Sequence, residues 1–133
     1  MKRQSITPAG SAEIMGAYSH GLKVDVGDSE MIFVTGQIAQ DKDGNVISDD
    51  IVEQTRYVFG QIKAILNEAG ASMDDVIKAQ LFLTDINDFA KVSPIRNEYF
   101  AGSRPVSTMV QIEALVKPGC KIEIEVTAVK EKS

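Results

Sequence analysis

Apolar and polar residues alternate along two neighbouring segments near the start of the chain, residues 22–26 and 31–39. Alternation with a period of two places every second side chain on the same face of a strand. The GDSE segment between them is only long enough for a tight turn. We therefore predict a β-hairpin with one buried face and one solvated face. A further turn is predicted at residues 41–45, where Gly44 and Asn45 tolerate positive φ.

Residues 50–70 carry apolar side chains at the three- and four-residue intervals of an amphipathic helix. At the start of this segment, Asp50 and Glu53 have the spacing of a capping box. At its end, Gly70 can adopt the left-handed conformation that terminates many helices. The pattern predicts one long helix that packs on a core along a single stripe.

A second helix is predicted over residues 87–102, where a proline interrupts an otherwise helical composition. Proline has no backbone N–H, so it is best tolerated in the first turn. We therefore expect Ser93 to be the N-cap and Pro94 to occupy the first helical position.

Three more segments are rich in the branched and apolar residues of strands. Residues 76–85 are apolar on both faces and predict a strand covered on both sides. Residues 107–115 and 121–129 are separated by VKPG, a turn signal that favours an antiparallel pair. The order of elements indicates an α+β fold in which both helices pack on one face of a mixed sheet. Since no element remains to cover the other face, we expect self-association.

Composition limits the classes of protein that this pattern can represent. A length of 133 residues with 44% hydrophobic content suits a single domain, residues 1–133. The formal charge of −5 opposes binding to nucleic acid. No apolar run approaches the roughly 20 residues of a membrane span, and no targeting signal follows the first residues, MKRQ. We expect a soluble, cytoplasmic protein.

Few side chains are suited to metal binding or to nucleophilic catalysis. One histidine, His20, and one cysteine, Cys120, cannot supply the ligands of a structural zinc site. A Ser-His-Asp arrangement around His20 would need an arbitrary choice of acid. The default interpretation is therefore that His20 is an ordinary histidine near a strand and that Cys120 is an inert thiol.

Two segments allow both a structural and a functional interpretation. In KIEIEV, Glu123 and Glu125 share one strand face, which is usually a solvated face. If an oligomer buries that face, burial would raise the pKa of one carboxyl, which could then activate water. In RPVSTMV, residues 104–110, the hydroxyls either satisfy local backbone groups at the start of a strand or form the rim of a ligand site.

Five segments together resemble the reactive intermediate deaminase family, which comprises RidA and YjgF-like proteins. The segments are GAYSHGLKVDVG, IFVTGQIAQD, NEAGASMDDVIKAQLFLTDINDF, the helix end Asn97-Glu98-Tyr99-Phe100, and RPVSTMVQIEALVKPGCKIEIEVTAV. They occur in the family's order and span nearly the whole chain. The resemblance implies a chorismate-mutase-like fold, a homotrimer whose sheets face a common centre, and small-molecule clefts between subunits.

The resemblance also implies a reaction and its residues. Members of the best-known branch hydrolyse enamines and imines to keto acids and ammonia without a cofactor. Tyr18 matches the family's tyrosine near the first strand, and Gly36 matches the glycine whose backbone faces the ligand. Glu123 matches the glutamate that positions the attacking water. These residues are the candidates for catalysis and ligand binding.

One position departs from the family's pattern. Ser107 stands where the branch has an arginine that grips the substrate carboxylate, and a hydroxyl carries no charge to replace it. Met109 should make the adjacent wall larger and more apolar. Arg104 or Arg96 could supply a substitute cation, although an offset of three residues from Ser107 would place Arg104 on the opposite face of an extended strand.

These observations leave more than one function open. The first hypothesis is a trimeric enamine or imine hydrolase with weak or no activity on simple 2-imino acids. The second is a trimer that binds a small metabolite without turnover. A ribonuclease or translation inhibitor, as suggested for relatives of the fold, fits poorly because the chain is acidic and has one histidine.

Overall fold

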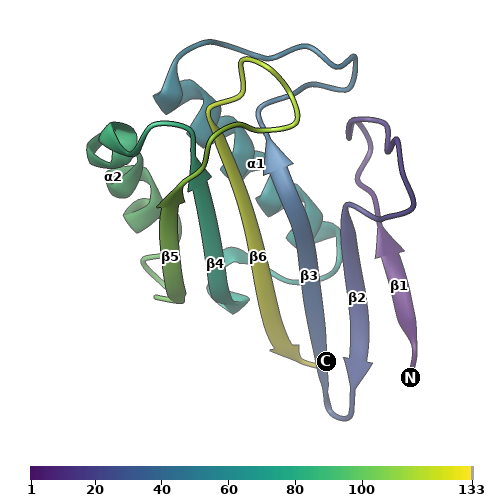
Figure 1. Cartoon of the computed structure of the whole chain (residues 1–133). Coiled ribbons are helices and arrows are strands. Elements are labelled where there is room, and N and C mark those ends of the chain that lie inside the picture. The colour runs from purple at the N-terminus through teal and green to yellow at the C-terminus, as the bar shows by residue number, and fades with distance from the viewer. Residues whose placement is uncertain (133) are drawn as a thin grey trace.

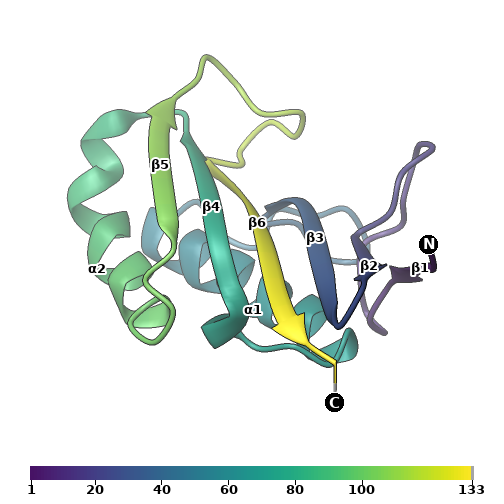
Figure 2. The same ribbon diagram turned by 90° about the horizontal axis from the view of Figure 1, so that it is seen from below.

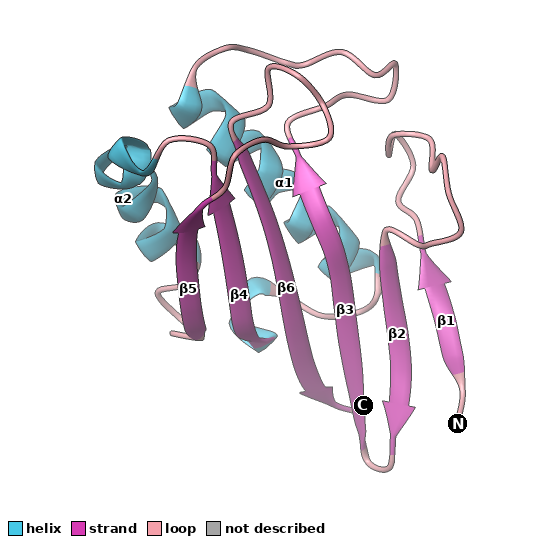
Figure 3. Cartoon of the chain, in the orientation of Figure 1, coloured by secondary structure: helices cyan, strands magenta, loops and turns pink. Residues whose placement is uncertain are grey.

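The computed structural model describes residues 1–132 and contains one six-stranded sheet with two α-helices (Figures 1 and 3). The strands are β1 (Arg3–Ile6), β2 (Gly21–Val26), β3 (Ser29–Ile38), β4 (Val76–Leu83), β5 (Val106–Gln111) and β6 (Ile122–Glu131). Their order across the sheet is β1-β2-β3-β6-β4-β5. All neighbours are antiparallel except β4 and β5, which are parallel, so the predicted mixed α+β sheet is confirmed.

The predicted long helix is present as α1 (Ile51–Glu68). The Asp50 carboxylate accepts a hydrogen bond of 2.9 Å from the backbone N–H of Glu53, which is one half of the predicted capping box. Gly70 has φ +82°, the left-handed conformation expected after the last turn. The apolar stripe, which includes Phe59, is fully buried against the sheet.

The predicted hairpin is confirmed as β2 and β3, and a further strand lies beside it. β1 pairs with β2 in antiparallel register, with Arg3 opposite Val24. Its sequence RQSI has only one apolar residue, Ile6, and that residue is buried. A short, mostly exposed edge strand has too few apolar positions to give a recognisable alternation, so the sequence pattern does not predict it.

The predicted antiparallel pair of C-terminal strands is wrong. β5 pairs in parallel with β4, and β6 lies between β3 and β4. Ile122, Ile124 and the other buried residues of β6 are covered by the helices, and β6 has a paired strand on each side. β5, in contrast, is exposed along almost its whole length. Burial of the apolar strand at the centre outweighs the local turn preference of VKPG, and the loop of residues 112–121 passes the end of β4 to join β5 to β6.

The predicted start of the second helix is also wrong. α2 (Phe89–Tyr99) begins four residues before Ser93, so Pro94 lies inside the helix. A short 3₁₀ turn, η2 (Ile86–Asp88), leads directly into α2 and sets the chain in a helical path. Starting this early leaves the carbonyl of Ala90 without its helical N–H partner, because proline has no N–H to donate.

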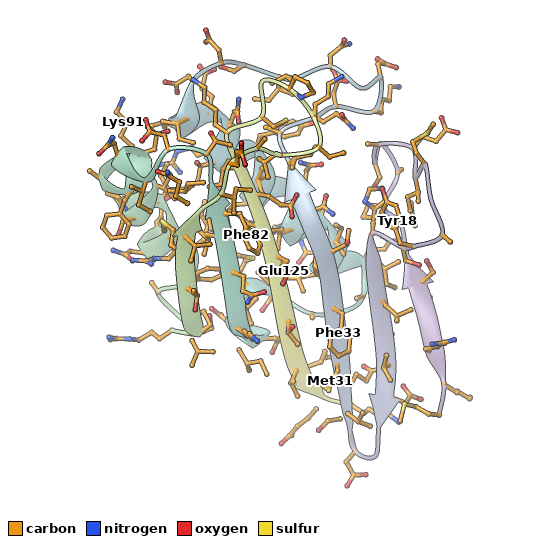
Figure 4. The ribbon with its side chains drawn as sticks, viewed as in Figure 1. Tyr18, Met31, Phe33, Phe82, Lys91 and Glu125 are labelled. Carbon is orange, nitrogen blue, oxygen red and sulfur yellow. The ribbon has the colours of Figure 1, made fainter. Side chains whose placement is uncertain are left out.

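Both helices cover the same face of the sheet, as predicted (Figure 2). α1 packs on β3 and β6 and contacts α2, where the rings of Phe59 and Tyr99 stack with centroids 4.5 Å apart. The opposite face carries the partly exposed side chains of Met31, Phe33 and Phe82 (Figure 4). Phe33 is 41% exposed there, which is unusual for a large aromatic ring at the centre of a sheet.

Candidate functional site

Glu123 and Gly36 lie together on adjacent strands. Glu123 of β6 pairs with Ile38 of β3, next to a register shift between Val34 and Gln37. A β-carbon placed on Gly36 would lie 2.6 Å from the carboxyl carbon of Glu123 and would contact its Oε2 directly. Glycine at position 36 therefore allows this carboxylate to approach the backbone closely, because a β-carbon there would force the Glu123 side chain to shift.

These two residues line a pocket of about 280 Å³ above the sheet. Tyr18 borders the same pocket, so the structure brings together the three residues that match the family's catalytic and backbone positions. Tyr18 lies just before the start of β2 and is 56% exposed in the single chain (Figure 4). Lys117, from the loop before β6, also borders the pocket and was not identified from the sequence.

Burial raises the pKa of Glu123 above its ordinary value, and the nearby charge of Glu125 raises it further. Both carboxylates lie on the open face, where Glu125 pairs with Gln80 and Glu123 with Phe82. A carboxyl group with a raised pKa holds and releases a proton closer to neutral pH than an ordinary glutamate does. Glu123 is therefore suited to exchange a proton with a bound water or ligand.

His20 borders the pocket but is held by structural contacts. It is 8% exposed, and its Nε2 donates a hydrogen bond of 2.7 Å to the carbonyl oxygen of Ala12. Its Nδ1 lies 3.5 Å from Nε2 of Gln37. These contacts agree with the default interpretation of His20 as an ordinary histidine near a strand, and the structure adds that it is buried.

Ser107 and Arg104 line a different hollow, of about 560 Å³, where α2 ends and β5 begins. Arg96 of α2 lines it as well, so both candidate substitutes for the missing arginine lie beside Ser107. Arg104 has φ +47°, the only positive φ of a non-glycine residue in the described part of the chain. This left-handed residue breaks the extended path, so the expected separation of Arg104 and Ser107 onto opposite faces does not occur.

Met109 lines neither pocket. It pairs with Leu81 across the parallel β4–β5 ladder and packs, partly buried, against the hydrophobic core. In the single chain its side chain therefore contributes to core packing beneath β5.

The two hollows lie on opposite faces of the same sheet. Ser107 pairs with Ala79, and Ala79 pairs with Val126, so these three side chains share the helix-covered face. Glu123 is three residues from Val126 along β6 and therefore points to the open face. One chain cannot bring Ser107 and Glu123 into one site, whereas the open face of one copy and the β5 edge of another could.

Other chemistries find little support in residues 1–132. No group of three or more His, Cys, Asp or Glu side chains in this range is arranged to hold a metal ion. Burial raises the pKa of the Cys120 thiol, which opposes the reactive thiolate form. Neither helix combines the length and the apolar character needed to cross a membrane.

Comparison with known proteins identifies the family. A family model described as endoribonuclease L-PSP matches residues 10–130. A RutC family protein of Pyrococcus abyssi is 42% identical over 132 residues, which cover 98% of this chain and 100% of that protein. The structure of YyfA from Yersinia pestis, of the conserved Rid protein family, matches with a TM-score of 0.84 and 32% identity, covering 96% of this chain and 98% of YyfA. That of TdcF from E. coli with bound serine matches with a TM-score of 0.81 and 32% identity, covering 96% of this chain and 99% of TdcF. The resemblance seen in the sequence is thereby confirmed, and the chain belongs to the endoribonuclease L-PSP family, which includes the RutC and Rid proteins.

Proposed function

We propose that this protein is a cofactor-free hydrolase of small enamines or imines that works in clefts between the subunits of a homotrimer. The observation that carries this proposal is the position of the Glu123 carboxyl over the Gly36 backbone, beside Tyr18, in a pocket where burial raises its pKa. A carboxylate held in this way can position a water molecule and take its proton. The related TdcF structure contains serine, which supports a small ligand for this fold.

The reaction needs little beyond a placed water. Water adds its oxygen to the carbon of the protonated C=N bond while Glu123 accepts one of the water's protons, which gives a neutral carbinolamine. Protonated Glu123 then returns this proton to nitrogen. The C–N bond breaks, the hydroxyl proton passes back to the Glu123 carboxylate as the carbonyl forms, and ammonia leaves. The raised pKa of Glu123 favours both transfers, because it makes the carboxylate a stronger base towards water and keeps the accepted proton available for nitrogen.

Assembly as a trimer would complete the site. The open sheet face exposes Phe33 and carries Glu123, while Ser107 lies across the sheet at the β5 edge. A neighbouring copy that covers the open face would bury Phe33 and bring its own Ser107 hollow towards Glu123. The single buried thiol, Cys120, is compatible with a reducing compartment, and we place the protein in the cytoplasm.

Simple 2-imino acids should be poor substrates because Ser107 has no positive charge to pair with their carboxylate. The test adds the purified protein to an amino-acid oxidase that generates 2-iminopropionate and follows trapping of the imine as its semicarbazone. We expect little suppression of trapping by the wild-type protein. Strong suppression would show that a guanidinium at position 107 is not needed.

Ser107→Arg provides the matched gain-of-function test. A charge-assisted pair between a guanidinium and a buried carboxylate contributes about 2 kcal/mol or more, which corresponds to a rise of about 30-fold or more in kcat/KM. The variant should therefore suppress semicarbazone formation at concentrations where the wild type does not. Ser107→Gln, which is long but uncharged, is the control and should remain weak.

A trimer that binds a small metabolite without turnover is the second candidate, favoured by the uncharged side chain of Ser107. A thermal-shift screen with keto acids, amines and heterocycles, coupled to an ammonia assay, separates the two functions. Stabilisation by a ligand without release of ammonia from any imine would support binding alone. Release of ammonia that Glu123→Gln abolishes would support the hydrolase.

A further inference from the structure

The hollow at the end of α2 is lined by two arginines and by no acidic residue. Arg96 reaches it from the last turn of α2, and Arg104 from the corner that leads into β5. Its remaining polar lining comes from Asn97 and Ser107, both of which are neutral. A concave surface with two positive charges and no negative charge attracts anions.

Neither guanidinium is neutralised within residues 1–132. The four ion pairs in this range use Lys23, Lys130, Lys132 and Arg56, and none uses Arg96 or Arg104. Arg96 donates only to neutral oxygens, from Nη2 to Ser93 Oγ at 2.9 Å and from Nε to Asn97 Oδ1 at 3.1 Å. These bonds fix the plane of its guanidinium and leave Nη1 free to donate to a ligand.

The backbone holds Arg104 in this place at an energetic cost. Its φ of +47° lies in the left-handed region, which is strained for a residue with a side chain. The Arg104 N–H donates to the carbonyl oxygen of Phe100 at 2.8 Å, which fixes the corner in front of Pro105. A strained residue that places a second unpaired cation beside the first one is consistent with a functional role.

We propose that the hollow lined by Arg96, Arg104 and Ser107 is an oxyanion-binding subsite that prefers dianions, either a phosphate group or a pair of carboxylates. Two guanidiniums can give parallel N–H donors to two or more oxygens, and two positive charges match a dianion better than a monocarboxylate. The small side chain at position 107 leaves the hollow open between the two arginines. As part of the substrate site this inference rests on the proposed function, but binding itself does not require turnover.

Placed in the cleft, the subsite selects a class of substrate. Arg96 and Arg104 flank the hollow where α2 ends and β5 begins, whereas in the proposed cleft Glu123 beside the C=N bond comes from the open face of the neighbouring copy. The favoured imine or enamine therefore carries its phosphate or second carboxylate several atoms away from the C=N bond. A compact 2-imino monocarboxylate does not use both arginines.

The test measures binding to the intact protein by titration calorimetry, at constant ionic strength, with inorganic phosphate, succinate and acetate as probes. We expect phosphate or succinate to bind at least about tenfold more tightly than acetate. Arg96→Gln and Arg104→Gln should each weaken dianion binding by about tenfold or more. Arg56→Gln is the charge-matched control, because Arg56 on α1 is already paired with Glu98 at 2.6 Å, and it should not change binding.

Several outcomes would overturn the subsite. The first is that neither phosphate nor succinate binds, and the second is that acetate binds as tightly as the dianions. The third is that Arg56→Gln loses as much dianion affinity as Arg96→Gln and Arg104→Gln, which would reflect net charge alone. Circular dichroism and sedimentation of each variant exclude misfolding as the cause of a loss. Dianion binding that needs both arginines, without ammonia release from any imine, would support the subsite and contradict the hydrolase. Imine hydrolysis that neither arginine variant affects, without dianion binding, would support the hydrolase and contradict the subsite.

Discussion

The close contact between Gly36 and Glu123 is the structural basis of the proposed catalysis. Because a β-carbon at position 36 would occupy the place of the carboxylate, Gly36→Ala should displace Glu123 from the pocket. A displacement of about 1 Å typically lowers a rate by roughly 100-fold. We expect turnover of a responsive imine to fall by about that factor in Gly36→Ala, with the fold retained in circular dichroism.

Gly60→Ala is the matched control for this substitution. Apart from its chain neighbours and the backbone of its own helix, no atom lies within 4 Å of a β-carbon placed on Gly60, which is in the middle of α1. Alanine is the better helix former, so this variant should keep its turnover and gain about 0.5–1 kcal/mol of unfolding free energy. Full turnover in a correctly folded Gly36→Ala would contradict the role assigned to the contact.

The raised pKa of Glu123 predicts how stability depends on pH. Burial and the charge of Glu125 make the folded chain bind this proton more tightly than the unfolded chain does. The resulting stabilisation is complete below the ordinary pKa of 4.5 and is lost as the pH rises through the higher folded-state pKa. Above that pH the buried, charged carboxylate lowers the unfolding free energy by a constant amount, which a neutral glutamine would not do.

Glu123→Gln should therefore be more stable than the wild type at pH 7 and should lose this advantage at pH 4. Urea unfolding at intervals across that range measures the difference. Glu113→Gln removes the same charge from an exposed position and serves as the control. Equal pH dependence of the unfolding free energy in Glu123→Gln and the wild type would contradict a destabilising effect of the buried carboxylate. If Glu123→Gln is more stable but releases less ammonia, Glu123 is needed for the reaction rather than for folding.

At the scale of elements, α1 depends on its first turn. Asp50 satisfies an N–H that has no partner within the helix, and loss of such a cap typically costs about 1 kcal/mol. Asp50→Ala should therefore lower the unfolding free energy in urea by about that amount without changing imine turnover. Asp49→Ala, one residue earlier, is the control because its exposed carboxylate accepts no hydrogen bond within residues 1–132. Equal losses in the two variants would indicate an effect of charge rather than of capping.

Sequence patterns predicted the helices and strands better than they predicted which strands pair with one another in the sheet. The stripe of α1 and the alternation of β2, β3 and β6 follow directly from period, because each has one buried face. The partner of β5 does not, since strand pairing depends on the whole core and the loop of residues 112–121 can span the sheet. The start of α2 was predicted wrongly for a similar reason, because the preceding 3₁₀ turn outweighed the preference of Pro94 for the first helical position.

The candidate site was predictable in its residues and not in its geometry. Resemblance to the family selected Tyr18, Gly36 and Glu123, and all three line one pocket. No spacing along the chain could reveal that Gly36 lies under a carboxylate, or that Arg104 adopts a left-handed conformation beside Arg96. These features depend on contacts between strands and helices far apart in sequence, which periodicity does not encode.

At the scale of the whole molecule, the sheet separates the two halves of the proposed site. Glu123 points to the open face, and Ser107 points to the helix-covered face at the β5 edge. In the proposed trimer, a functional site then takes Glu123 from one subunit and the Ser107 hollow from the next. Closed symmetry would repeat this pairing at every interface of that proposed trimer.

Two inactive variants should therefore restore each other when they share a trimer. Glu123→Gln removes the proton acceptor. Ser107→Glu places a negative charge, which repels an anionic substrate, in the hollow lined by Arg96 and Arg104, so each variant alone should be inactive. After dissociation in mild urea and reassembly of an equal mixture, about a quarter of the sites would combine an intact Glu123 with an intact Ser107 from the neighbouring subunit. Ammonia release should recover to about a quarter of the wild-type value, because each intact site works independently. If both residues acted within one chain, no mixture could contain an intact site, and the reassembled trimers would stay inactive.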